Sequence, residues 1–113
     1  MKELFKPLVY KYQDGRVLDL SDKYVVSNYG TFKNIKTGYT LTTGLKVSPK
    51  GKIENRYATV GIGGRVLRVH RAVASTFVEG YAPGLEIDHI DGDIYNNKAD
   101  NFRWLTKAEH MAI

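Results

Sequence analysis

Short runs of alternating apolar and polar residues, each closed by turn-forming residues, fill the chain up to residue 69. Strict alternation over a few positions is typical of antiparallel strands, and glycine, asparagine or proline between the runs marks turns. This pattern predicts strands over residues 8–12, 16–20, 24–27, 31–35, 45–47, 56–62 and 65–69. The last two are joined by Gly63 and Gly64, which suit the positive φ angles of a tight two-residue hairpin turn.

The hydrophobic period changes after this hairpin. Val69, Val73, Thr76 and Phe77 follow one another at the spacing of one face of a helix. Glycine and proline within residues 80–84 stop the pattern, as they commonly do at the end of a helix. We therefore predict a short amphipathic helix over residues 70–78.

The last quarter of the chain predicts a strand, a loop, a second strand and a helix. The strands fall at residues 85–90 and 102–105 on either side of a polar loop, and Thr106 with Glu109 forms the capping-box pattern of a helix N-terminus. The predicted fold class is thus α+β, with short antiparallel strands and one helix followed by a compact ββα unit. A length of 113 residues suits a single domain over 1–113, with a β-rich part at 1–78 and the ββα unit at 85–113.

Charge is divided unevenly between these two parts. Residues 23–78 carry ten lysines and arginines against one acid, whereas residues 79–113 carry three basic residues against seven acids. A basic body favours a polyanionic partner, because each neutralised phosphate releases counterions. The acidic residues 79–113 should repel a polyanion, and a divalent cation bound there would offset this repulsion. An uneven surface charge with no such partner is the alternative interpretation.

The chain contains no cysteine, so a disulfide framework and cysteine-ligated zinc are both excluded. Any metal site must therefore use His, Asp, Glu or Asn side chains. The N-terminus has no apolar run of signal-peptide length, and no segment approaches the length of a membrane span. These observations predict a cytoplasmic protein without a membrane partner.

Two of the three histidines, His89 and His110, lie in the predicted ββα unit, and Asp88 precedes His89. Phosphodiester hydrolysis requires a base that deprotonates water and a cation that stabilises developing charge. Adjacent strand residues point to opposite faces, so Asp88 and His89 can face one site only if the strand ends or bends there. In that case Asp88 and His110 could share one divalent ion and leave the His89 imidazole to accept a proton. Histidines that are merely exposed or hydrogen-bonded are the alternative. The spacing of acids and glycine in residues 88–97 excludes an EF-hand calcium loop.

The residues of this unit, in order and spacing, resemble the HNH (His-Asn-His) endonucleases, especially those of phage introns and free-standing phage homing genes. The matching runs are 87–93 (IDHIDGD), 96–97 (NN), 100–106 (DNFRWLT) and 109–111 (EHM). Residues 69–74 (VHRAVA) with Phe77 resemble the helix before the catalytic unit of that family. Residues 24–30 (YVVSNYG) resemble a modular DNA-binding motif often found ahead of it. The resemblance covers most of the chain from about Lys23 onward.

This resemblance implies a metal-dependent endonuclease with a ββα-metal (His-Me finger) unit that hydrolyses DNA to a 5′-phosphate and a 3′-hydroxyl. It implies His89 as the general base and Asn101 as the residue that bonds across the loop to orient His89. Asp88 and His110 would hold one divalent ion, with Trp104 in core packing. Mg²⁺ is the expected ion, and Mn²⁺, Ni²⁺ or Zn²⁺ are alternatives because histidine is a softer ligand than the asparagine that some relatives have in place of His110.

DNA is the expected partner, and five basic residues are candidate phosphate contacts. They are Lys33, Lys36, Arg65, Arg68 and Arg71. His70 matches the family at a non-catalytic position, and we expect it to make a structural hydrogen bond.

The chain stops three residues after His110, whereas phage homing enzymes usually continue into a second DNA-binding region. We therefore expect a weakly specific nickase, in the host cytoplasm if the gene is phage-encoded. Cleavage of both strands by one active site would need a dimer or two successive nicks. The alternatives are a DNA-binding module that does not cut, with a degenerate or structural metal site, and a protein-interaction domain that binds structural metal.

Overall fold

The computed structural model describes residues 2–44 and 57–112, and within these it is an α+β fold with short antiparallel sheets. The elements are β1 (Phe5–Pro7), β2 (Val9–Lys11), β3 (Val17–Asp19), β4 (Tyr24–Ser27), β5 (Phe32–Asn34), β6 (Thr43–Gly44), β7 (Thr59–Ile62), β8 (Arg65–Arg68), α1 (Val69–Phe77), β9 (Glu86–His89), the 3-10 turn η1 (Ala99–Asn101), β10 (Phe102–Leu105) and α2 (Lys107–Met111). Strands pair in the orders β1-β4-β5, β2-β3, β6-β7-β8 and β9-β10. The predicted α+β class is confirmed.

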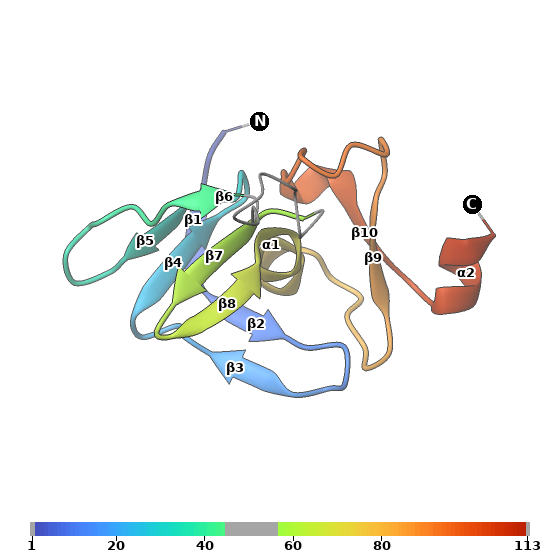
Figure 1. The fold of residues 1–113 in the computed structure, drawn as a ribbon, viewed down its shortest axis with the longest axis horizontal. Helices are drawn as coiled ribbons and strands as arrows, with labels where there is room; N and C mark the ends of the chain where they lie inside the picture. The colour runs from blue at the N-terminus through green and yellow to red at the C-terminus, as the bar shows by residue number, and fades with distance from the viewer. Residues whose placement is uncertain (1, 45–56, 113) are drawn as a thin grey trace, which may run out of the picture.

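Helix α1 is the centre of the hydrophobic core. Strand β8 leads into it without an intervening loop, and Figure 1 shows strands of several sheets arranged around it. Its Val69, Ala72 and Val73 are almost fully buried, and they belong to one cluster with Leu8 and Phe32 from the N-terminal strands. The apolar stripe predicted for this helix thus faces the β-rich part of the chain.

Polar side chains of α1 satisfy the backbone of β2. The Ser75 hydroxyl oxygen accepts a hydrogen bond from the Lys11 backbone N–H at 3.0 Å, and Thr76 Oγ1 donates to the Val9 carbonyl at 3.2 Å. Arg71 Nη1 donates to the Lys11 carbonyl at 2.7 Å. A strand edge that would otherwise expose unpaired backbone groups is therefore closed by the helix.

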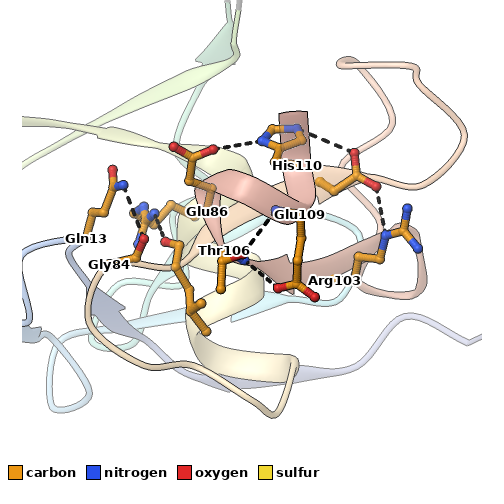
Figure 2. A network of polar contacts seen from close by, with 10 residues as sticks. Gln13, Gly84, Glu86, Arg103, Thr106, Glu109 and His110 are labelled. Atoms are coloured by element: carbon orange, nitrogen blue, oxygen red, sulfur yellow. Dashed lines mark hydrogen bonds and ion pairs between the residues drawn. The ribbon is translucent and has the colours of Figure 1, made fainter. Parts of the chain in front are cut away.

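The C-terminal unit, defined as β9, η1, β10 and α2, is a hairpin followed by a short helix. Strand β10 pairs with β9 in antiparallel register, with Phe102 opposite His89. Helix α2 begins after Thr106, whose Oγ1 accepts from the Glu109 N–H at 3.1 Å while the Thr106 N–H donates to Glu109 Oε1 at 2.9 Å (Figure 2). The predicted capping box is confirmed.

Trp104 attaches this unit to the rest of the molecule. Its indole Nε1 donates to the Val78 carbonyl at 3.0 Å, just after α1 ends, and its ring meets Tyr81 edge-on with 5.4 Å between ring centroids. Trp104 packs against the core cluster. The expected packing role of this residue is confirmed.

The turn between β4 and β5 contacts the long loop of the C-terminal unit. The Asn28 carbonyl accepts from the Ala99 N–H at 2.8 Å. Gly30 has a φ of +88°, and a Cβ there would meet Val69 Cγ1 at 3.2 Å and Asn97 Cβ at 3.5 Å. Glycine is therefore required both by the backbone conformation and by the close approach of the loop.

Most predicted elements lie where the pattern placed them, with differences at the boundaries. Helix α1 begins one residue before the predicted 70–78 span and ends one residue earlier. Strands β1 and β6 were not predicted, because all their residues are exposed and β6 has only two residues, neither of them apolar. The strand predicted at 45–47 lies outside the described residues. Within the described ranges, no helix has both the length and the apolar character needed to cross a bilayer.

Candidate active site

Asp88 and His110 converge on one side of the β9-β10 hairpin. Asp88 lies in the middle of β9, and α2 places the His110 ring beside it, with 3.7 Å between Asp88 Oδ1 and His110 Nε2. The Asp88 side chain is 14% exposed and the His110 side chain 36%. The two predicted metal ligands, which are twenty-two positions apart in the sequence, are therefore neighbours at a partly open surface.

Each of these two side chains has an outer partner. Glu86 Oε1 lies 2.9 Å from His110 Nδ1, and Arg103 Nε donates to Asp88 Oδ2 at 2.9 Å. Figure 2 shows Glu86, His110 and Arg103 along this edge of the unit. Glu86 was missed at the sequence level, although it precedes Asp88 by two positions on a strand and therefore shares its face.

The donor atoms of this pair fit a divalent cation. Two ligands about 2.1 Å from one ion, at an angle of roughly 90° to 110°, are themselves roughly 3.0–3.5 Å apart. The 3.7 Å between Asp88 Oδ1 and His110 Nε2 needs only a small closure to reach this spacing. No cluster of three His, Cys, Asp or Glu ligands occurs in residues 2–44 and 57–112. With Asp88 and His110 as the two protein ligands, the other positions around an ion would be filled by water or substrate.

His89 lies on the other face of β9, because side chains alternate along the strand. Its ring is buried, with 7% exposed, against His70, Tyr57 and Phe102, at centroid separations of 5.4, 5.9 and 5.0 Å. This alternation was foreseen as an obstacle to a shared site. The strand ends at His89, as the prediction required, but the imidazole still points into the aromatic cluster.

One cavity lies next to His110 and to the rings that pack on His89. It has a volume of about 230 Å³, and its lining includes Glu86 and His110 from the C-terminal unit. The lining also includes His70 and Tyr57, the two rings that pack against His89. The remaining lining residues are Gln13, Arg68, Arg71 and Ile87. Basic, acidic and imidazole groups therefore surround one polar cavity.

The ring nitrogens of His89 have different surroundings. Nε2 lies 3.4 Å from Asn97 Oδ1, and since a carbonyl oxygen only accepts, this contact requires the proton on Nε2. No hydrogen bond from Nδ1 is found among the described residues. With the proton on Nε2, the lone pair of the neutral His89 ring is on Nδ1.

Asn101 holds the loop between the two strands. Its Oδ1 accepts from the Asp91 N–H at 3.0 Å, and its Nδ2 donates to Asp91 Oδ1 at 3.0 Å and to the Asn96 carbonyl at 3.1 Å. Hydrogen bonds from the Asn96 side chain, the Asp93 backbone and Asn101 hold the pKa of Asp91 below its usual range. Among the described contacts, the amide that reaches His89 directly belongs to Asn97, so orientation of His89 by Asn101 would act through the loop and remains a prediction.

The structural hydrogen bond that was predicted for His70 is not found among the described contacts. Its Nδ1 is buried without a partner, and its ring stacks on Tyr57 with 4.5 Å between centroids. Burial, reinforced by the charges of His89, Arg68 and Arg71, lowers the pKa of His70 to about 3. His70 is therefore a neutral ring of the aromatic cluster at neutral pH.

This buried neutral imidazole should make the protein less stable in mild acid. In the unfolded chain it binds a proton below a pKa of about 6.5, which the folded state does not accept until the pH falls to about 3. Its contribution is complete above pH 6.5 and is lost as the pH falls, by about 2 kcal/mol at pH 5. Urea unfolding at pH 7 and pH 5 should show a smaller loss for His70→Phe than for the wild type. Equal losses in the two proteins would contradict this prediction.

The five predicted phosphate contacts differ in solvent exposure and in the contacts that they already make within the protein. Lys36, Arg65 and Arg68 are exposed, and Lys33 is half-buried over the Phe5 ring at 4.6 Å. Arg71 is also half-buried, and its guanidinium donates to the carbonyls of Lys11 and Leu85 at 2.7 and 3.4 Å. These bonds give Arg71 a structural role, although it also lines the cavity.

Comparison with known proteins is consistent with this geometry. The family model described as HNH endonuclease matches residues 68–112. The DNA endonuclease I-HmuI of Bacillus phage SP01 is 42% identical over 84 residues, which are 74% of this chain and 47% of that protein. An HNH endonuclease of Acanthamoeba polyphaga mimivirus is 36% identical over 93 residues, which are 80% of this chain and 22% of that protein.

The chain is also similar to a solved structure of an HNH homing endonuclease. The structure of DNA binding and cleavage by the HNH homing endonuclease I-HmuI superposes with a TM-score of 0.65 and 38% sequence identity, covering 81% of this chain and 51% of that chain. The chain therefore spans about half, or less, of the length of the relatives it matches.

Proposed function

The chain belongs to the HNH endonuclease family, and on that premise we propose that it is a DNA endonuclease that hydrolyses phosphodiester bonds with one divalent metal ion. The observation that carries the proposal is the distance of 3.7 Å between Asp88 Oδ1 and His110 Nε2. Asp88 lies on β9, the strand that ends at His89, and His110 lies on α2. The chain covers only about half, or less, of the length of its relatives, so the proposed activity rests on these residues and not on the activity of the longer proteins.

In this proposal Asp88 and His110 are the protein ligands of the ion. A carboxylate oxygen and an imidazole nitrogen suit Mg²⁺ when water completes the shell, and the imidazole also accommodates Mn²⁺, Ni²⁺ or Zn²⁺. When bound, the ion supplies charge stabilisation for the phosphate and the departing oxygen. Arg103 holds the second Asp88 oxygen at 2.9 Å, which keeps Oδ1 turned toward His110.

His89 is the proposed general base. Its Nδ1 takes a proton from a water molecule, whose oxygen forms the new bond to phosphorus while the bond to the 3′ oxygen breaks. The 3′ oxygen takes a proton from solvent water and leaves as a hydroxyl, the other product carries a 5′-phosphate, and His89 returns its proton to solvent. Asn97 stabilises the His89 tautomer that this step needs, with the proton on Nε2, because Asn97 Oδ1 accepts a hydrogen bond from Nε2–H at 3.4 Å. Packing of the ring against Tyr57, His70 and Phe102 fixes its direction.

The five candidate basic residues are the proposed contacts to the phosphates of the DNA backbone. Arg65 and Arg68 are exposed on β8, and Arg68 lines the cavity beside Glu86 and His110. Lys33, Lys36 and Arg71 are the further candidates. A chain with one Asp–His pair cuts one strand at a time, so we propose nicking as the basic reaction and a dimer or successive nicks for double-strand breaks.

Supercoiled plasmid tests the function directly. Incubation with Mg²⁺ or Mn²⁺ should convert it to the nicked form, and excess EDTA should stop the reaction. Salt-sensitive DNA binding without nicking in any divalent metal would instead support a DNA-binding module that does not cut. Failure to bind DNA at low salt would contradict both.

Arginine contacts to phosphate should be visible in the salt dependence of binding. Each lost phosphate contact should reduce the slope of log affinity against log salt by about 0.9, so Arg65→Ala with Arg68→Ala should reduce it by roughly 1.8. Fluorescence anisotropy with a labelled duplex between about 50 and 200 mM salt measures this slope. Arg16→Ala is the matched control, because Arg16 Nε is already paired with Asp14 Oδ2 at 2.7 Å. An unchanged slope in the double variant would remove β8 from the interface.

A further inference from the structure

Glu86 lies on the side of His110 that faces away from Asp88. It is the first residue of β9 and shares a strand face with Asp88, and α2 contacts both strands of the hairpin. As a result the His110 ring is placed between two carboxylates that belong to the same strand. Figure 2 shows the Glu86 side chain directed at the His110 ring.

The two contacts of the His110 ring differ in length. Nδ1 lies 2.9 Å from Glu86 Oε1, which is a direct hydrogen bond, whereas Nε2 lies 3.7 Å from Asp88 Oδ1, which is too long for one. A carboxylate only accepts when ionised, so the short contact requires a proton on Nδ1. In the neutral ring the lone pair is then on Nε2, in the gap between the ring and Asp88.

We propose that Glu86 is a positioning residue for metal binding: it holds the Nδ1–H of His110 and thereby presents Nε2 to a divalent cation shared with Asp88. This inference rests on the proposed function, because it takes His110 as a ligand. Histidine ligands commonly donate their second N–H to a carboxylate, which fixes the tautomer and ring direction and raises the basicity of the ligand nitrogen. Loss of such a partner typically weakens metal affinity about 10- to 100-fold.

A purely structural ion pair would behave differently. The Glu86 side chain is 28% exposed and that of His110 36%, and ion pairs at such surfaces contribute little to stability. Helix α2 has its own anchor in the Thr106–Glu109 capping box. Removal of Glu86 should therefore leave the fold intact while it changes the His110 tautomer and the metal affinity.

Mn²⁺ titration by calorimetry of the full chain tests this inference. Glu86→Ala should weaken Mn²⁺ binding about 10- to 100-fold. Glu86→Gln keeps an acceptor oxygen and should lose less. Glu79→Gln, which removes an exposed acid with no described contact to the site, should bind Mn²⁺ as the wild type does. In a His110→Ala background the Glu86→Ala change should have no further effect, because Glu86 acts through His110.

Nitrogen NMR of His110 in the metal-free protein gives a readout independent of the metal. The wild type should show the proton on Nδ1, and Glu86→Ala should shift the ring toward the Nε2-protonated tautomer. Equal Mn²⁺ affinity in Glu86→Ala and wild type, or a loss that persists in the His110→Ala background, would overturn the role of Glu86. If Mn²⁺ binding is unaffected by Asp88→Ala as well, or the wild type binds no Mn²⁺, the metal site of the proposed function fails and this inference fails with it.

Discussion

Replacement of His89 by alanine should lower the rate of DNA cleavage by about 10²- to 10⁴-fold while DNA affinity changes little. The reason is that His89 is proposed to touch only the attacking water. Its Nε2 lies 3.4 Å from Asn97 Oδ1, and with the proton on Nε2 the ring nitrogen that can accept the water proton is Nδ1. Single-turnover nicking of supercoiled plasmid at saturating Mg²⁺, together with anisotropy measurements of DNA binding, separates the two effects.

Because His89 is buried, its variants need a control for folding. His89→Gln keeps more of the volume, and both variants should be compared at temperatures below their measured unfolding midpoints. Tyr95→Ala, in the loop that follows β9 and at a position that is 59% exposed, should cleave at nearly the wild-type rate. Cleavage that continues at the wild-type rate in folded His89→Ala would remove this residue from the chemistry.

Replacement of Asp88 by alanine should abolish Mn²⁺ binding and lower cleavage by about 10³-fold or more, since charge stabilisation by a metal ion is worth several kcal/mol. Asp88 is the carboxylate nearest His110 Nε2, at 3.7 Å, and its other oxygen is already bonded to Arg103. Calorimetric titration with Mn²⁺ measures the first effect and plasmid nicking the second. Asp100→Asn removes an exposed acid from the same unit and should change neither. Wild-type Mn²⁺ affinity in Asp88→Ala would contradict the proposed ligand set.

Features that depend on local sequence were predicted well. The capping box of Thr106 and Glu109 acts over three residues, and the apolar stripe of α1 acts over nine, so both could be read from neighbouring positions. The two-strand hairpin of the C-terminal unit follows from the same local alternation. The α+β class followed because most strands were bounded by turn-forming residues, α1 carried a helical apolar stripe and α2 a capping box.

The resemblance brought Asp88 and His110 together correctly, but several other tertiary contacts were not predicted. The Glu86–His110 hydrogen bond joins positions twenty-four residues apart, and it exists because α2 folds back over β9. The aromatic cluster around His89 is assembled from β9, β10, α1 and Tyr57, which no sequence period connects. His70 was expected to make a structural hydrogen bond because it matches the family at a non-catalytic position, whereas in the fold its ring stacks on Tyr57 and its Nδ1 has no partner among the described residues.

The strand alternation at Asp88 and His89 shows where sequence reasoning identified a problem without solving it. Adjacent strand residues point to opposite faces, and they do so here. In the fold, a cavity of about 230 Å³ is lined both by Glu86 and His110 and by the rings that pack on His89. The size and walls of that cavity depend on how α1 packs against the C-terminal unit, and this information is not local.

A crystal structure with Mn²⁺, located by its anomalous scattering, is the most direct test of the site. A single ion should lie roughly 2.0–2.3 Å from an Asp88 carboxylate oxygen and from His110 Nε2, with the His89 ring outside its coordination shell. An ion bound elsewhere, or one that takes His89 as a ligand, would contradict the proposed division between metal ligands and general base.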